Sequence, residues 1–176
     1  GKWKDSVSAF ASYLDSWPNH ERAWQAATAA SLASLQSGSD ALPFAEKAVK
    51  LSPSETDRAS SSLLVASILF DRKEYSDAES VLAGIADGTA TKGLTPSAPR
   101  ALFTLAEISV RLKKQDEAEK RWLSVAARFP NDALAEESLY RAAEMRWLGK
   151  NWASAAELFT QYRQKYPQGK FLEASL

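Results

Sequence analysis

The sequence predicts an all-α fold, a solenoid of antiparallel helix pairs, and two observations support this expectation. The first is a long-range repeat: the segment from Trp3 to Pro18 matches the segment from Trp152 to Pro167 in its aromatic, small and proline residues. The second is the recurrence of apolar residues at helical spacing in the stretches between such segments. Because self-similarity at a period of about 20–50 residues is the signature of repeat architectures, the repeat decides the fold class.

Four prolines close successive units of the repeat: Pro18, Pro53, Pro130 and Pro167. The gap between Pro53 and Pro130 is about twice the others, so it holds two units and an insertion, and the hidden unit lacks its proline. We therefore expect one domain over residues 1–176. It contains a half repeat over 3–18, repeats over about 19–53, 54–88, 99–130 and 131–167, and a partial repeat over 168–176.

Each unit is expected to contain two helices. The first helices are predicted near residues 24–35, 61–70, 100–112 and 136–148, where apolar residues fall on one stripe. The second helices follow, with Ser76-x-x-Glu79 and Asp116-x-x-Glu119 as capping boxes and Ser39 or Asn151 as side-chain caps. Residues 87–98, rich in glycine, threonine and proline, are expected to form a surface loop.

Charge and composition exclude several classes of function. Twenty-two basic residues balance 22 acidic ones, so no overall field attracts nucleic acid or an anionic membrane. The chain has no cysteine, which removes disulfides and thiolate chemistry. The most apolar stretch, residues 63–70, is much shorter than the roughly 20 residues that span a bilayer, so no membrane insertion is expected.

At set places in each unit the residues resemble those of the tetratricopeptide repeat family. Besides the closing prolines, alanines of the second helices match at 41, 78, 118 and 155, and bulky residues match at Phe10, Leu82, Trp122 and Phe159. The chain departs from the family pattern in that the inter-helix glycine is kept only as Gly149. The resemblance implies a right-handed superhelix whose partners bind on its concave face.

Two phrases resemble a narrower branch of this family. Arg128-Phe-Pro-Asn-Asp and Lys165-Tyr-Pro-Gln-Gly-Lys look like the bacterial envelope branch, which includes periplasmic partners of the Tol–Pal system and outer-membrane assembly lipoproteins. This resemblance implies a periplasmic or cell-envelope location in a bacterium and a role in an envelope assembly. The sequence is also compatible with the cytoplasm.

A partner-binding face is expected on the inward, non-core positions of the first helices. Its partner would be a protein or peptide with apolar anchors and a basic residue, since aromatic residues dominate binding hot spots. The alternative for the aromatic positions is that they pack between neighbouring repeats. The candidate binding residues are Gln25, Phe103, Glu107, Tyr140, Glu144 and Trp147.

No catalytic, metal or cofactor site is expected. Glu107 and Glu144 occupy equivalent positions and could suggest an acid and a base, but repeated helices place like residues side by side without any catalytic role. The single histidine, His20, suits a solvated helix start better than a general base. A second hypothesis is a small-ligand-binding or regulatory domain attached to an enzyme or transport system, with residues 87–98 closing a pocket.

The two ends of the sequence are expected to expose apolar surface, as if cut within repeats of a longer protein. Trp3, Phe10, Tyr13 and Trp17 lie on a second helix without its partner, and residues 168–176 are expected to begin an unpartnered helix. Terminal repeats normally carry a polar outer face, so self-association through these ends is expected.

Overall fold

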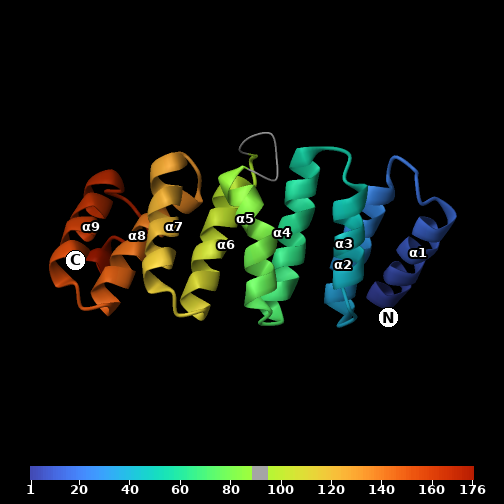
Figure 1. The fold of residues 1–176 in the computed structure, drawn as a ribbon, viewed down its shortest axis with the longest axis horizontal. Helices are drawn as coiled ribbons and strands as arrows, with labels where there is room; N and C mark the ends of the chain where they lie inside the picture. Colours follow the sequence, from blue (N-terminus) through green and yellow to red (C-terminus); the bar gives the residue numbers. More distant parts are fainter. Residues whose placement is uncertain (89–94) are drawn as a thin grey trace. The chain divides into compact units, whose positions relative to one another are not determined.

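The computed structural model describes residues 1–88 and 95–176, and every regular element in these residues is helical (Figure 1). The chain forms two compact units, Gly1–Ser97 and Ala98–Leu176, each of which is a stack of helices packed in chain order. The predicted all-α fold of stacked helix pairs is therefore confirmed. Of the expected loop over 87–98, residues 89–94 lie outside the described residues.

The first unit contains five helices in its described part. They are α1 (Lys2–Ser16), α2 (Ala23–Ser37), α3 (Leu42–Leu51), α4 (Glu55–Asp71) and α5 (Tyr75–Asp87). Alanines fill the contacts between them: Ala27, Ala45 and Ala48 are fully buried, and Leu14 of α1 packs into the same region. Small residues allow the helix backbones to approach closely, which is why each unit of the repeat needs them at fixed places.

The second unit contains α6 (Ala98–Arg111), α7 (Gln115–Arg128), α8 (Leu134–Leu148), α9 (Trp152–Lys165) and a short 3-10 helix, Glu173–Ser175. One part of its core is a cluster of Ala126, Leu139 and Tyr162, on which other aromatic rings pack. Helices α2, α4, α6 and α8 cover the ranges predicted for the first helices.

The same left-handed turn joins the two helices of four pairs. Its residue with positive φ is Gly38 in one case and a lysine in the others, Lys73, Lys113 and Lys150, with φ between 61° and 72°. In each turn the following backbone N–H donates to a carbonyl five residues back, as in Asn151 to Arg146, which satisfies the end of the first helix. Gly149, the expected inter-helix glycine, has φ −75°, so its neighbour Lys150 takes this role.

The predicted side-chain caps of the second helices are wrong. Helix α5 begins at Tyr75 and α7 at Gln115, so Ser76 and Asp116 lie inside the first turn instead of preceding it. Asn151 does precede α9, but its side chain makes no capping bond, and at α3 the carboxylate of Asp40, in place of Ser39, accepts from the N–H of Leu42. The left-handed turn starts these helices one residue earlier than the capping-box pattern places them.

The prediction for residues 168–176 is also wrong. They form no α-helix; only Glu173–Ser175 adopt a 3-10 turn, and Phe171 packs against the body of the unit. Exposure at the ends is found at three side chains: Trp3 (54%), Trp17 (60%) and Leu176 (92%). Within the described residues, no helix is both long and apolar enough to cross a bilayer.

Candidate functional site

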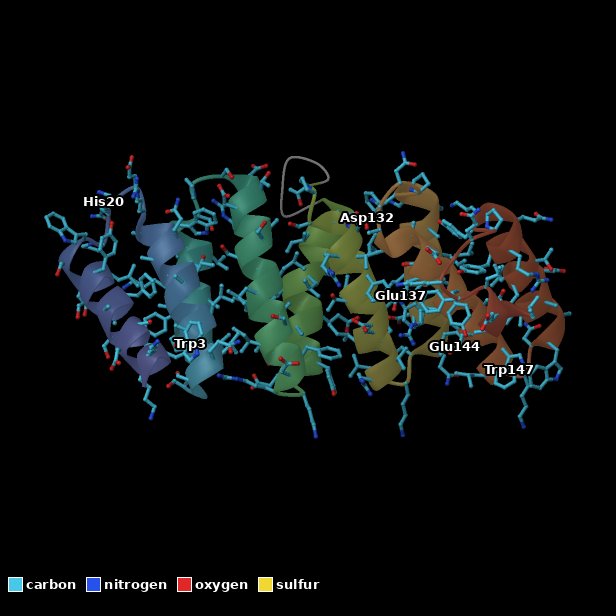
Figure 2. The ribbon with its side chains drawn as sticks, turned by 180° about the vertical axis from the view of Figure 1, so that it is seen from behind. Trp3, His20, Asp132, Glu137, Glu144 and Trp147 are labelled. Atoms are coloured by element: carbon cyan, nitrogen blue, oxygen red, sulfur yellow. The ribbon has the colours of Figure 1, made fainter. Side chains whose placement is uncertain are left out.

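The second unit brings three of the predicted binding residues into one pocket. Tyr140, Glu144 and Trp147, all on α8, line a cavity of about 530 Å³ together with residues of α9 and the C-terminal segment. Figure 2 marks Glu144 and Trp147 on this helix. Their spacing of three and four residues places them on one face, as the sequence predicts.

Aromatic rings from two helices form the apolar part of this pocket. Trp147 of α8 meets Trp152 of α9 edge to face, with ring centroids 5.6 Å apart, and Tyr140 lies 5.8 Å from Phe159. Both tryptophans are more than half exposed. Half-exposed tryptophans beside a cavity are typical anchoring surfaces for a polypeptide, because tryptophan and tyrosine are enriched at binding hot spots.

Negative charge exceeds positive charge beside the pocket. Arg141 bridges Glu137 and Glu144, at 3.4 Å from each carboxylate, and Lys170 lies 3.3 Å from Glu137. Glu107 on α6 accepts no hydrogen bond from any described residue, and burial raises the pKa of this carboxyl, although the charge of Arg141 opposes the rise. The surface formed by Glu107, Glu137 and Glu144 is therefore complementary to a cation.

Phe103 does not belong to an accessible face. Its side chain is 5% exposed and meets Trp122 of α7 edge to face at 6.3 Å. The packing alternative, which the sequence left open for this residue, is correct, because α7 covers this side of α6. The expectation that Phe103 lines the binding groove is wrong.

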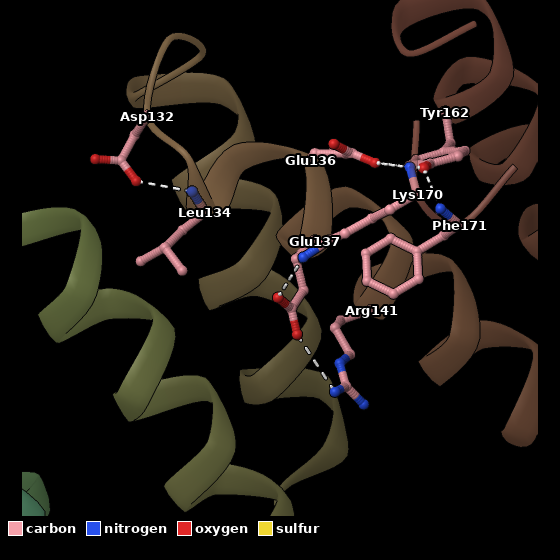
Figure 3. Close-up of polar contacts among 8 residues, drawn as sticks. All are labelled: Asp132, Leu134, Glu136, Glu137, Arg141, Tyr162, Lys170 and Phe171. Carbon is pink, nitrogen blue, oxygen red and sulfur yellow. Dashed lines mark hydrogen bonds and ion pairs between the residues drawn. The ribbon is translucent and has the colours of Figure 1, made fainter. Parts of the chain in front are cut away.

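A buried hydrogen-bonded network beneath the pocket was missed by the sequence analysis (Figure 3). The hydroxyl of Tyr162 donates to Glu136 Oε1 at 2.7 Å, the backbone N–H of Lys170 donates to the same oxygen at 2.7 Å, and the N–H of Phe171 donates to Tyr162 Oη at 3.0 Å. Burial, followed by the bond to Glu136, raises the pKa of Tyr162 to about 12. The network fixes the backbone at residues 170 and 171.

This network places the ring of Phe171 on Tyr140. The two rings stack with centroids 4.5 Å apart and an interplanar angle of 11°. Gly169 makes the geometry feasible, because a Cβ there would lie 2.6 Å from Glu136 Oε1 and closer still to Tyr162 Oη. The glycine after Tyr166-Pro167 was the available signal in the sequence.

The remaining predicted residue, Gln25, lies in the first unit and lines a different pocket. This cavity of about 860 Å³ lies between α1 and α2, with Phe10, Tyr13 and Trp17 on the α1 side and Ala26 and Ala29 beside Gln25 on α2. His20 lies at its rim, as expected for a residue at a helix start. Its Nδ1 is 2.7 Å from Tyr13 Oη and accepts from the N–H of Arg22 at 3.2 Å.

Neither pocket has the makings of a metal centre. Among residues 1–88 and 95–176, no group of three or more metal-ligating side chains is placed to hold an ion. Glu144 is ion-paired with Arg141, so the two equivalent acids Glu107 and Glu144 differ in their environments. The arrangement is suited to contact with a polypeptide surface.

Comparison with known proteins agrees with the fold. RapI in its apo form superposes with a TM-score of 0.79 at 13% identity, over 96% of this chain and 50% of that one. The MamA fragment 41-end from Desulfovibrio magneticus RS-1 gives 0.68 at 18% identity, over 97% and 89%. YrrB, described as a TPR protein with an unusual peptide-binding site, gives 0.67 at 16% identity, over 98% and 83%.

No curated protein matches the sequence. Two tetratricopeptide repeat family models do match, one over residues 66–133 and the other over residues 137–169. These ranges together cover more than half of the chain, and both units consist of the helix pairs that the family predicts. The chain belongs to the tetratricopeptide repeat family.

Proposed function

We propose that this chain is a protein-interaction scaffold and that the pocket of α8 and α9 binds a peptide or protein with an apolar anchor and a basic residue. Tetratricopeptide repeats generally bind protein or peptide partners, and they are generally not catalytic. We propose that this chain, likewise, is not an enzyme. The peptide-binding site named for YrrB is consistent with this function in a protein of the same fold.

One observation supports the choice of site more than any other. Trp147 and Trp152 expose aromatic surface next to a carboxylate, Glu144, and near the half-buried carboxylate of Glu107, which has no hydrogen-bonded partner among the described residues. An apolar anchor would enter the cavity between the tryptophans, and a lysine or arginine beside it would meet the acids. Burial of the cation against these acids would add specificity as well as affinity.

A peptide-display selection against the whole chain tests this site. Selected peptides should carry an aromatic or large aliphatic residue close to a lysine or arginine. Trp147→Ala should weaken their binding by about tenfold or more, as expected for a hot-spot residue. Leu148→Ala is the matched control, since Leu148 is equally exposed on the same helix but does not line the pocket, and it should have little effect. Equal effects of both changes would place the site elsewhere.

The basic residue of the partner is tested by charge removal. Glu107→Gln should weaken binding of the selected peptides severalfold and should reduce the salt dependence of binding. Glu157→Gln, on an exposed part of α9, is the control and should leave binding unchanged. If peptides without any basic residue are selected and Glu107→Gln has no effect, the partner is recognised through apolar contacts alone.

We also propose that the scaffold functions in a bacterial envelope assembly, in the periplasm. The support is the resemblance of residues 128–132 and 165–170 to the envelope branch of the family. Cell fractionation of the native gene product provides the test. Recovery with cytoplasmic markers alone would contradict the proposed location.

A further inference from the structure

The pocket of the first unit has a counterpart in the second unit that is covered by a helix. At one constant offset along the chain, Phe10 corresponds to Phe159, Tyr13 to Tyr162, Trp17 to Tyr166 and Pro18 to Pro167. Helix α1 is thus the equivalent of α9, and each lies in its own unit. The counterpart therefore shows how this aromatic face is covered when a helix packs on it.

In the second unit the covering helix is α8. The ring of Tyr140 lies 5.8 Å from Phe159 and 5.9 Å from Tyr162, and Leu139 packs in a cluster with Tyr162 and Tyr166. As a result Tyr162 is completely buried. Two adjacent apolar residues of α8 are enough to cover the whole face.

In the first unit the same positions remain open. Phe10 and Tyr13 are only half-buried, and Trp17 is 60% exposed, whereas its equivalent Tyr166 is half-buried. The exposure of Trp3 is not a sign of a missing cover, since Trp3 and its equivalent Trp152 are exposed to the same extent. The uncovered surface is therefore confined to Phe10, Tyr13, Trp17 and the α2 side chains that complete the 860 Å³ cavity.

We propose that this pocket is a docking site for an amphipathic α-helix of a partner protein whose apolar stripe resembles that of α8. The helix would place a large aromatic residue over Phe10 and Tyr13, as Tyr140 does in the counterpart, and a leucine-sized residue beside it toward Trp17. Ala26 and Ala29 on α2 leave room for a helix to approach closely. This surface is distinct from the pocket of α8 and α9 and does not depend on its function.

Charge at the rim favours an acidic residue one turn before the aromatic anchor. In α8 that position is Glu136, four residues before Tyr140. Arg22 lines the open pocket, and its only ion pair is a long one, 4.0 Å to Glu21, with both side chains mostly exposed. A carboxylate on the docked helix would therefore find a cation without first breaking a buried interaction.

A stapled helical peptide with the sequence of residues 134–146 is a direct probe, because stapling removes most of the ordering cost of a short helix. Calorimetry with the whole chain should show binding, and hydrogen exchange should show added protection of residues 9–17. The same peptide with Tyr140→Ala should bind at least about tenfold more weakly, which is the loss expected for a central aromatic anchor. Absence of binding by the parent peptide at about 1 mM, or equal binding by both peptides, overturns the proposal.

Two substitutions in the chain verify where the probe binds. Ala9→Arg places a charge in the pocket from an exposed position of α1, so it should abolish binding without disturbing the fold. Ser8→Arg, at the neighbouring exposed position outside the pocket, is the control and should bind within about twofold of the parent. If both variants bind normally, the peptide binds elsewhere and the proposal is overturned.

Sedimentation across concentration distinguishes a foreign helix from a second copy of the chain. Under the proposal the chain stays monomeric at concentrations where the stapled peptide binds. A dimer that Ala9→Arg dissociates, while Ser8→Arg does not, would show that a second copy covers the pocket and would overturn the choice of occupant.

Discussion

The α1 and α9 faces carry the same residue classes but make different hydrogen bonds. In the second unit the hydroxyl of Tyr162 donates to a carboxylate and accepts from the backbone of Phe171. In the first unit the equivalent hydroxyl of Tyr13 pairs with the ring of His20, and His20 itself accepts from the backbone of Arg22. A covering helix therefore turns a solvent-accessible contact into a buried network that fixes the following segment.

The backbone N–H four residues after the closing proline is satisfied at both ends, as it is at α8. His20 accepts it from Arg22, Asp132 from Leu134 at 2.8 Å, and Tyr162 from Phe171 (Figure 3). The position of this bond is kept while the acceptor changes. What differs is burial, and a buried bond costs much more to lose than an exposed one, because its partner is left unsatisfied.

The largest expected effect comes from Gly169→Ala. A Cβ at this position collides with Tyr162 Oη and Glu136 Oε1, so the network must open. We expect the second unit to lose about 1–3 kcal/mol of unfolding free energy, the usual cost of overpacking. Residues 168–176 should also lose hydrogen-exchange protection. His20→Ala, at the equivalent place in the first unit, is the control and should cost less. Unchanged denaturation of Gly169→Ala would mean that the network is not needed.

Removing the two hydroxyls compares the ends most directly. Tyr162→Phe leaves the N–H of Phe171 without its acceptor and should cost about 1–3 kcal/mol, whereas Tyr13→Phe affects an exposed bond and should cost less than about 1 kcal/mol. Urea denaturation measures both. Similar losses would show that burial does not separate the two sites.

The pH dependence gives a second reading of Tyr162→Phe. Folding raises the pKa of Tyr162 from its model value of 10.0 to about 12, so the folded state favours the protonated form. The stability that this provides is complete below pH 10 and is lost as the pH rises toward 12. The advantage of the wild type over Tyr162→Phe should therefore shrink across this range. A constant difference would contradict the assignment.

Turn residues should produce smaller and opposite effects in the two units. Gly38→Ala places a side chain at φ 72° with no atom within 4 Å, so its cost is a backbone effect of about 1 kcal/mol. Lys150→Gly relieves the same conformation at φ 61° in the second unit and should raise stability by up to about 1 kcal/mol. Shifts of the urea midpoint at constant slope would check both changes.

The smallest expected effect is that of Glu107→Gln on stability. Burial raises the pKa of Glu107 above its model value of 4.5, so the ionised carboxylate is disfavoured in the folded state. Its favourable contribution is present below pH 4.5 and is lost as the pH rises through the raised value. At neutral pH, Glu107→Gln should therefore stabilise the second unit by less than about 1 kcal/mol. The gain should fade in acid, and denaturation at several pH values would test this.

Much of the fold could be predicted because the repeat reports directly on packing. The alanines that match between units, such as Ala78, Ala118 and Ala155, are all buried, and the aromatic-to-proline spacing located the ends of the second helices. The capping boxes failed because Ser76 and Asp116 suit a helix start in general, whereas the left-handed lysine before each helix sets the start here. Lysine carries no signal for positive φ.

The candidate site was only partly predictable. Helical spacing was enough to bring Tyr140, Glu144 and Trp147 to one pocket, but Phe103 occupies the place corresponding to Tyr140 in its own repeat and is covered by α7. Burial at equivalent positions depends on which neighbour packs there, and one sequence does not contain that information. The network of Tyr162 was missed for another reason: its acceptor, Glu136, lies on a different helix.

The constant offset between α1 and α9 has a consequence for engineering. A chain joined from Pro167 to the Asn19 of another copy would keep the repeat in phase, so copies could be concatenated without an added linker. At each such junction His20 would take the place of Gly169 beside Tyr162, and Arg22 would take that of Phe171. The junction would therefore close with the histidine-centred contact found at α1 and not with the carboxylate-centred one found at α9.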